Sequence, residues 1–163
     1  MFSFLSKKDG RDMNTKLLIS LSGIALLMAA CSSTCDVEQE GAVTPGSAED
    51  FKTNVPDRVY FDFDSSKVSD SAKKRLEAQA CWLKTYGSTK ATVEGHADIR
   101  GTAEYNMALG NSRANAASKV LKDLGIDSSR LTVVSYGKER VADTGTTEEA
   151  HAKNRRAVTV IDG

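Results

Sequence analysis

The 163-residue chain carries no net charge and few aromatic side chains. Its 22 lysines and arginines balance 22 aspartates and glutamates, and aromatic residues make up 6% of the sequence. Nucleic-acid-binding proteins usually carry a basic stripe for the phosphates, and those that bind single strands add aromatic side chains for the bases. Neither pattern is visible here, so the composition argues against a nucleic-acid partner.

Side chains that bind metals or catalyse reactions are also scarce. There are two histidines and three cysteines, without a Cys-x-x-Cys or cysteine–histidine spacing. His96 and Asp98, with Glu94 and His151, can be interpreted as metal ligands, but H-x-D leaving a strand is equally typical of a hydrogen-bonded turn. No serine, cysteine or carboxylate pair stands in a nucleophilic or acid–base arrangement. We therefore predict no metal site and no catalytic residues, in a protein that is not an enzyme.

The longest apolar run falls short of the roughly 20 residues that cross a bilayer. It extends from Leu17 to Ala30, about 14 residues, and follows Lys16. A basic residue before a short apolar run is typical of a secretory signal, which we place at residues 1–30. The preceding stretch MFSFLSKKDGRD contains acidic residues, which are unusual at this position. We therefore hypothesise that translation starts at Met13.

The signal ends in MAAC, which resembles a bacterial lipobox. In a lipobox, small residues precede a cysteine that is acylated and becomes the new N-terminus. The resemblance implies that Cys31 carries N-acyl and S-diacylglycerol groups, with no other cofactor. Met28 stands where leucine, valine or isoleucine is preferred, so ordinary cleavage that leaves Cys31 as a structural thiol is the alternative. Ser32, in place of aspartate, favours sorting to the outer membrane with the domain facing the periplasm.

Residues 32–57 contain both prolines, few large apolar side chains and a surplus of acidic ones. This composition predicts a flexible linker, so we assign residues 31–57 to the lipidated cysteine and a periplasmic linker. As a flexible coil, these 26 linker residues span roughly 30 Å on average. Cys35 lies in the linker and Cys81 in a predicted helix. A disulfide between them is compatible with an oxidising compartment, but the spacing does not imply one.

From Arg58 onward, the hydrophobic periodicity predicts alternating strands and helices. We predict strands at residues 59–63, 91–96, 131–136 and 156–161, and helices at 69–86 and 103–124. Ser69 is a plausible N-cap, Gly125 ends the second helix, and a short helical turn is expected near Glu148. The order predicts an α/β (α+β) two-layer sandwich, with two main helices packed on a sheet, as one domain at 58–163.

An arginine lies on the apolar side of the second predicted helix. The predicted apolar face consists of Leu109, Ala117, Val120 and Leu124, and Asn106 and Arg113 fall within the same arc. A half-buried arginine needs a carboxylate partner, and Asp98 in the preceding turn is near in sequence. Two interpretations follow. Asp98 and Arg113 bind a zwitterionic ligand near the free amides of Thr102 and Ala103, or they form a salt bridge that braces the turn.

Several motifs carry a family resemblance: YFDFDS, VEGHADIRGTAEYN, the pattern N-x-x-L-x-x-x-R-A from Asn106, VVSYGKE and AKNRRAVTV. Residues 59–161 resemble OmpA-like peptidoglycan-binding domains, and the added lipobox and linker are similar to the peptidoglycan-associated lipoprotein (Pal) family. The resemblance implies a mixed four-stranded sheet. It also implies an outer-membrane lipoprotein that binds peptidoglycan and tethers the membrane to the wall. The implied protein partner is a TolB-like periplasmic protein of the Tol-Pal system, which acts in cell division.

The resemblance further implies that Asp98 and Arg113 hold the diaminopimelate residue of the peptidoglycan stem peptide. It extends the site to Phe63, Asp64, Asn106 and Leu109. Thr102 and Tyr105 are weaker candidates, because a helix N-cap and a packed aromatic side chain explain them equally well. The sequence departs from the family pattern at Ile99, where glutamate is frequent, and at Ser65, where lysine is frequent. A cell-wall hydrolase, the alternative activity, would need a catalytic group. Arg155 and Arg156 have three interpretations: a solvated basic patch, a salt bridge at the end of the sheet to Asp62 or Asp64, or a surface for a partner.

Overall fold

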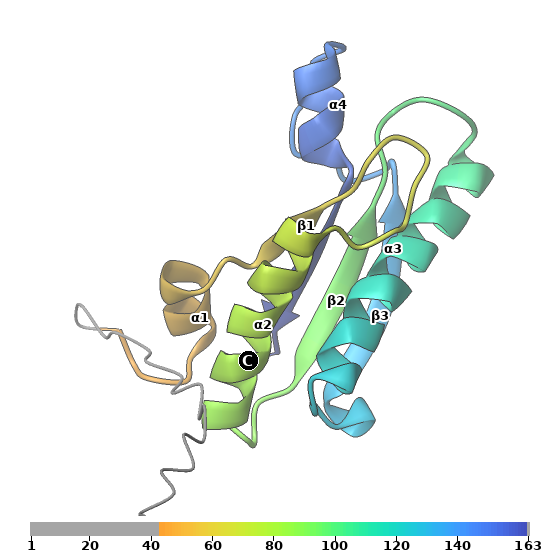
Figure 1. The fold of residues 1–163 in the computed structure, drawn as a ribbon. Coiled ribbons are helices and arrows are strands. Elements are labelled where there is room, and N and C mark those ends of the chain that lie inside the picture. Colours follow the sequence, from red (N-terminus) through yellow and green to blue (C-terminus); the bar gives the residue numbers. More distant parts are fainter. Residues whose placement is uncertain (1–42, 163) are drawn as a thin grey trace, which may run out of the picture. The chain divides into compact units, whose positions relative to one another are not determined.

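The structure, a computed structural model, describes residues 43–162. Its elements along the chain are α1 (Ala48–Asn54), β1 (Arg58–Tyr60), α2 (Asp70–Thr85), β2 (Ala91–His96), α3 (Ala103–Asp123), the 3-10 turn η1 (Ser128–Arg130), β3 (Leu131–Gly137), α4 (Glu148–Asn154) and β4 (Arg156–Ile161). Figure 1 shows α2 and α3 lying along the sheet and α4 beyond one of its ends. The predicted order of strands and helices is confirmed.

The four strands form one mixed sheet in the order β1-β4-β2-β3. Strands β2 and β3 are parallel, and α3 makes the crossover connection that parallel strands require. Strand β4 runs antiparallel to both β1 and β2, with Glu94 opposite Val158. A register shift between Gly95 and His96 marks the end of β2. The loops that follow β1 and β2 therefore leave the sheet at the end where α3 begins.

Capping residues set the ends of the long helices. The side chain of Ser69 accepts a hydrogen bond from the Ala72 amide at the start of α2, and Thr102 does the same for Tyr105 at the start of α3. Gly125, with a φ of +94°, follows the end of α3. Strand β1 is shorter than predicted, because the chain leaves the sheet after Tyr60 instead of after Phe63.

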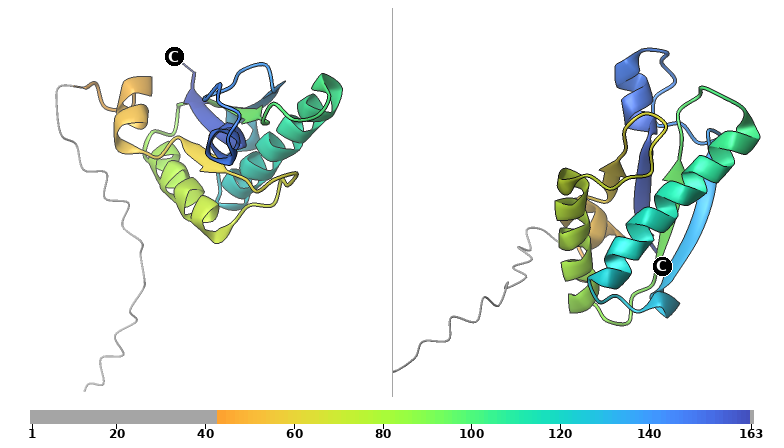
Figure 2. Two further views of the ribbon diagram at one scale, coloured as in Figure 1. Left: turned by 90° about the horizontal axis from the view of Figure 1, so that it is seen from above. Right: turned by 45° about the vertical axis from the view of Figure 1, so that its right-hand side comes forward.

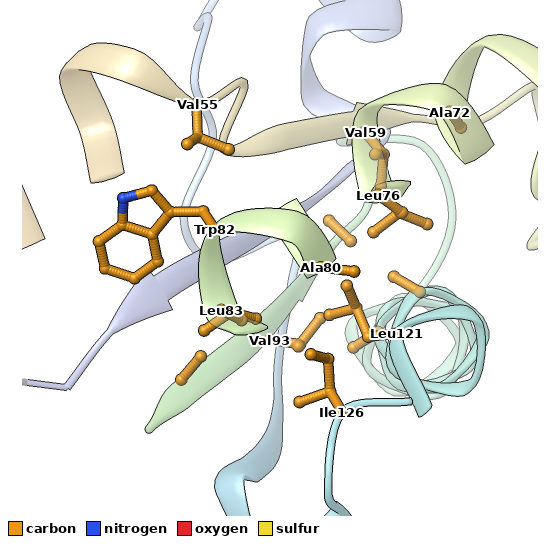
Figure 3. Close-up of a cluster of buried hydrophobic side chains, with 14 of the residues drawn as sticks. Val55, Val59, Ala72, Leu76, Ala80, Trp82, Leu83, Val93, Leu121 and Ile126 are labelled. Carbon is orange, nitrogen blue, oxygen red and sulfur yellow. The ribbon is translucent and has the colours of Figure 1, made fainter. Parts of the chain in front are cut away.

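Helices α2 and α3 cover the same face of the sheet, as the view from above shows (Figure 2). Between these two layers lies the hydrophobic core, in which α2 contributes Leu76 and Leu83, β2 contributes Val93 and α3 contributes Leu121 (Figure 3). The structure therefore has the predicted two-layer architecture, with two main helices on a mixed four-stranded sheet.

The buried face of α3 differs from the predicted one. Its buried residues are Asn106, Gly110, Arg113, Ala114, Ala117, Ser118 and Leu121. Three residues of the predicted apolar face, Leu109, Val120 and Leu124, are only partly buried. The helix is turned so that its small residues and Arg113 face the sheet, and Leu109 faces the pocket described below.

Glycines at the contact between α3 and β2 allow this close approach. A Cβ atom added to Gly95 would lie 1.9 Å from the carbonyl oxygen of Gly110, and one added to Gly110 would lie 2.4 Å from Oγ of Ser135. Both distances are far below van der Waals contact. Any side chain at Gly95 would force α3 away from the sheet.

The predicted linker is corrected at its C-terminal end, where α1 forms and packs onto the domain. Phe51 is 2% exposed and contacts the Trp82 ring edge-on, with 4.9 Å between ring centroids. Asp50, also buried, accepts hydrogen bonds from Trp82 Nε1 (3.0 Å) and Asn54 Nδ2 (2.7 Å). Composition failed to predict this helix because α1 has a single large apolar side chain, and its stability comes from contacts with distant residues.

We expect Asp50→Asn to weaken the docking of α1 in a pH-dependent way. Burial acts to raise the pKa of Asp50, but its hydrogen bonds from Gly46, Asn54 and Trp82 outweigh burial and lower the pKa below the ordinary 3.8. A lowered pKa in the folded state stabilises the fold above the unfolded-state pKa, and this stabilisation is lost as the pH falls through the folded-state value. Replacement by asparagine should cost about 1–3 kcal/mol at pH 7.

Urea unfolding followed by Trp82 fluorescence measures this effect. The difference between wild type and Asp50→Asn should shrink as the pH falls below 3.8. Asp123→Asn serves as a control, because Asp123 is exposed and, among residues 43–162, its ion pair is with Lys119 one helical turn away. A difference between wild type and Asp50→Asn that stays constant down to pH 3 would contradict the assignment of the carboxylate as the stabilising group.

Several predictions fall on residues outside the described range. The signal at 1–30, the start at Met13 and the lipidation of Cys31 belong to this group. Cys81 on α2 is disulfide-bonded. The sequence left the pairing of Cys35 with Cys81 open, and it stays open because Cys31 and Cys35 both lie outside residues 43–162. Among residues 43–162, no helix has the length and apolar character needed to cross a membrane.

Candidate functional site

A pocket of about 200 Å³ opens between the loop after β1, the turn after β2 and the first turns of α3. Six of its lining residues are predicted site residues: Phe63, Asp64, Asp98, Asn106, Leu109 and Arg113. Arg100, Gly101 and Tyr105 complete the lining. Because its side chains carry charges of both signs, we call it the mixed-charge pocket.

Arg113 reaches this pocket from the buried side of α3. Its guanidinium donates to three backbone carbonyls, those of Ser65 (2.8 Å), His96 (2.9 Å) and Asp62 (3.1 Å). These bonds hold the loop after β1 against the end of β2. Burial is the main cause that lowers the pKa of Arg113, to about 10, so the side chain is a cation at neutral pH.

Asp98 has different partners from those expected. Its carboxylate accepts from Arg100 Nη2 at 2.6 Å and from the Arg100 amide at 3.1 Å, and it lies 3.5 Å from Arg155 Nη1. Within residues 43–162, its ion pairs are with these two arginines, so the alternative interpretation, a direct salt bridge from Asp98 to Arg113 that braces the turn, is wrong. The two predicted residues instead line one pocket while each is held by other groups.

The carboxylate of Asp98 is ionised at neutral pH. It is 5% exposed, and burial acts to raise its pKa. The hydrogen bonds and the charge of Arg100, together with Arg155, outweigh burial and lower the pKa below the ordinary 3.8. The mixed-charge pocket therefore contains a fixed anion and a fixed cation from two separate networks.

Aromatic side chains border the charged groups. Phe63 is 61% exposed, and the Arg100 guanidinium lies 4.2 Å from its ring centroid, within the range of a cation–π contact. Tyr105 donates from its hydroxyl to the carboxylate of Asp64, whose φ of 51° is unusual for a residue other than glycine. The Tyr105 bond ties α3 to the loop after β1 and fixes one wall of the pocket.

The remaining predicted residues have structural roles in the same region. Asn106 donates from Nδ2 to the Arg100 carbonyl at 2.8 Å and so fixes the turn that carries Asp98. Thr102 caps α3 through its side chain and does not line the pocket. Asparagine on the apolar side of the helix is thus explained by the turn that it holds.

Sequence reasoning missed Arg100 and Arg155 as parts of the site. A salt bridge to Asp62 or Asp64 was one of the interpretations of Arg155, but its Nη1 lies 2.8 Å from Glu148 and 3.5 Å from Asp98. Arg156 instead donates to the backbone carbonyls of Arg140 and Asn154. Arg100 had a local signal, because it lies two residues after Asp98. Arg155 had none, because 57 residues separate it from Asp98.

Metal binding has no support in the described part of the chain, where no group of three or more His, Cys, Asp and Glu side chains is arranged to hold an ion. Within residues 43–162, the buried His96 ring makes no hydrogen bond of ordinary length, and its Nε2 lies 3.6 Å from a carboxylate oxygen of Glu94. Burial is the main cause that lowers the pKa of His96, to about 4. His96 is therefore a neutral core side chain at physiological pH.

Comparisons with known proteins agree with this fold. Residues 60–155 match the model of the OmpA family. The peptidoglycan-associated lipoprotein of Brucella melitensis is 42% identical over 148 residues, 86% of this chain and 88% of that protein. Its counterpart in Mesorhizobium japonicum is 50% identical over 123 residues, 76% of this chain and 73% of that protein.

A solved structure extends the likeness to three dimensions. The crystal structure of the peptidoglycan-associated lipoprotein from Burkholderia pseudomallei superposes with a TM-score of 0.64 and 40% identity, covering 66% of this chain and 91% of that one. These families consist of structural proteins and not of enzymes. The chain belongs to the OmpA family, among the relatives named peptidoglycan-associated lipoproteins.

Proposed function

We propose that the chain is an outer-membrane lipoprotein that binds peptidoglycan non-covalently and tethers the outer membrane to the cell wall. The ligand group is the diaminopimelate residue of the stem peptide. The observation that carries the proposal is the presence of Asp98 and Arg113, with opposite charges, in one pocket formed by three segments of the domain. The names of the relatives support peptidoglycan as the ligand.

The chemistry of diaminopimelate fits the pocket. Its side chain ends in a second amino-acid group, so it presents an ammonium and a carboxylate on an apolar methylene stem. Asp98 suits the ammonium, and Arg113 suits the carboxylate through a charge-assisted hydrogen bond. Leu109 and the exposed ring of Phe63 provide apolar contacts for the methylenes. A ligand with a single charge would interact with the charge of only one of these two side chains.

Pull-down with purified sacculi tests the proposal. The protein should sediment with intact sacculi and remain soluble after the wall has been digested. Free diaminopimelate should release it, whereas lysine, which lacks the second carboxylate, should release much less. Sedimentation that is insensitive to diaminopimelate would rule out this ligand.

Anchoring is proposed to depend on Cys31, and we expect Cys31→Ser to release the protein into the soluble periplasmic fraction. A single acyl chain holds a protein only marginally at a membrane, whereas two or more chains hold it stably. Fractionation of cells expressing the variant measures this effect, with Cys35→Ser as the matched control that should remain in the membrane fraction. Membrane association of Cys31→Ser that survives high salt would argue against lipidation.

A TolB-like periplasmic protein is the proposed protein partner, which connects the chain to the Tol-Pal system in cell division. Four exposed hydrophobic side chains favour a protein surface near the mixed-charge pocket: Phe63, Ile99, Tyr105 and Met107. Such a group of exposed apolar residues is typical of an interaction site. Because Phe63 and Tyr105 also line the pocket, the partner and peptidoglycan would compete for it.

A further inference from the structure

A second pocket, of about 390 Å³, lies on the other side of the loop after β1. Its walls come from the end of β1, this loop, the start of α2 and the end of α4. Figure 1 shows α4 at the same end of the domain as the start of α3. The residues that matter for its chemistry are Tyr60, Asp62, Ser69, Ser71, Lys153 and Arg155. We call it the α4 pocket.

Donors and acceptors of hydrogen bonds are mixed in the α4 pocket. Asp62 supplies an exposed carboxylate, and within residues 43–162 no ion pair or side-chain hydrogen bond engages it. The hydroxyls of Ser69 and Ser71, 3.0 Å apart, can donate and accept. Lys153 and Arg155 supply N–H groups. This set matches a ligand that carries several hydroxyl or amide groups and no strong charge of one sign.

An exposed aromatic ring adds an apolar surface beside these polar groups. Tyr60 is 42% exposed, although the Arg75 guanidinium lies 6.0 Å from its ring centroid. A pyranose ring has an apolar face of C–H groups and a rim of hydroxyls. An exposed aromatic ring next to hydrogen-bond donors and acceptors therefore fits a sugar better than it fits a peptide or an inorganic ion.

Arg155 joins the α4 pocket to the mixed-charge pocket. The side chain is almost fully buried, and its Nε donates to the Phe61 carbonyl at 3.0 Å. Its Nη1 lies 3.5 Å from the Asp98 carboxylate, which lines the mixed-charge pocket. Arg155 lines the α4 pocket and contacts Asp98 of the mixed-charge pocket, so the two pockets are neighbours.

We propose that the α4 pocket binds an N-acetylated amino sugar of the peptidoglycan glycan strand. This inference rests on the proposed function, because it places the stem peptide in the mixed-charge pocket. Two residues separate diaminopimelate from the sugar-linked end of the stem, which gives about 7 Å of extended chain before the link itself. The acetamido group of the sugar would meet the serine hydroxyls, and its C–H face would lie on Tyr60.

Titration with two defined probes tests the proposal on the intact domain. One probe is the free stem tripeptide ending in diaminopimelate, and the other is the same tripeptide on its disaccharide. Wild type should bind the disaccharide form more tightly, by about threefold to tenfold, the range of one aromatic contact. Tyr60→Ala should remove this difference and leave the affinity for the free tripeptide unchanged. Asp62→Asn should reduce the difference without changing the shape of the pocket.

Val160→Ala is the matched control, because Val160 is a similarly exposed residue that lines neither of these two pockets. It should keep the wild-type difference. Equal affinity of wild type for the two probes would overturn the sugar site while leaving the diaminopimelate site intact. Failure of both probes to bind would overturn the proposed function and, with it, this inference. A Tyr60→Ala variant that retains the full difference would also overturn it.

Discussion

Gly95→Ala is expected to prevent the domain from reaching its native fold. The added methyl would meet the Gly110 carbonyl oxygen at 1.9 Å, a backbone atom that cannot rotate away as a side chain would. Relief requires α3 to move off the sheet, and this movement would open the core at Ala114 and Ala117, both of which are buried. We expect a loss of more than about 3 kcal/mol, above the usual cost of overpacking.

Gly87→Ala is the matched control for this prediction. The same methyl at Gly87 has no heavy atom within 4 Å, and no positive φ is present there. Alanine should therefore be neutral or slightly stabilising at Gly87, because it reduces the freedom of the unfolded chain. Thermal unfolding by circular dichroism compares the two variants. Similar melting temperatures would show that α3 can shift without loss, contrary to the packing described.

Asp98→Asn is expected to abolish binding to sacculi while the domain stays folded. The amide keeps the shape of the side chain and can still accept from the Arg100 amide, but it no longer attracts an ammonium group. Loss of one partner of a charge pair in a partly desolvated site typically costs 2–5 kcal/mol, roughly a 30- to 4,000-fold loss of affinity. Because Arg155 keeps Glu148 as a partner, the loss of stability should be much smaller, about 1–2 kcal/mol.

Arg113→Ala is expected to lose binding as well, but the structure changes how this result must be interpreted. Arg113 is fully buried and donates to three carbonyls, which alanine would leave without a donor. We therefore expect Arg113→Ala to lower stability as well, by at least about 3 kcal/mol. The double variant should bind no better than either single variant.

Sacculus sedimentation at a temperature well below each melting point separates the two effects. Asp123→Asn removes an exposed carboxylate at the far end of α3 and should bind like wild type. If Asp98→Asn binds sacculi as well as Asp123→Asn does, then Asp98 does not hold the ligand. Its role would then be limited to pairing with Arg100 and Arg155.

Local sequence signals predicted most of the fold. Ser69, Thr102 and Gly125 mark helix ends through bonds with near neighbours, so their effect is visible in a short window. The predictions that failed depend on contacts between distant residues. Helix α1 is held by Asp50 and Trp82, which are 32 residues apart. The rotation of α3 about its own axis depends on Gly95, which lies on β2. The periodicity of the α3 sequence carries no information about Gly95.

The sequence likewise predicted some features of the site and missed others. The position of Arg113 on a buried helix face was a strong signal, because an inward cation needs a partner. The identity of the partners was not predictable, since backbone carbonyls leave no trace in the sequence. The interpretation that paired Asp98 with Arg113 depended on their closeness in the sequence. In the structure, Asp98 instead forms ion pairs with Arg100 and Arg155. The positions of these two arginines depend on the packing of α4 and on the turn after β2.

The docking of α1 also has a mechanical meaning if the chain is anchored at Cys31 and held by the wall at the mixed-charge pocket. Tension entering at residue 43 reaches α1 before it reaches the sheet, and α1 is attached through Phe51 and the Asp50–Trp82 bond. Detachment of residues 48–57 would lengthen the tether by up to about 35 Å. We expect α1 to act as an extensible element that yields under load while the sheet, α3 and the bound ligand stay in place.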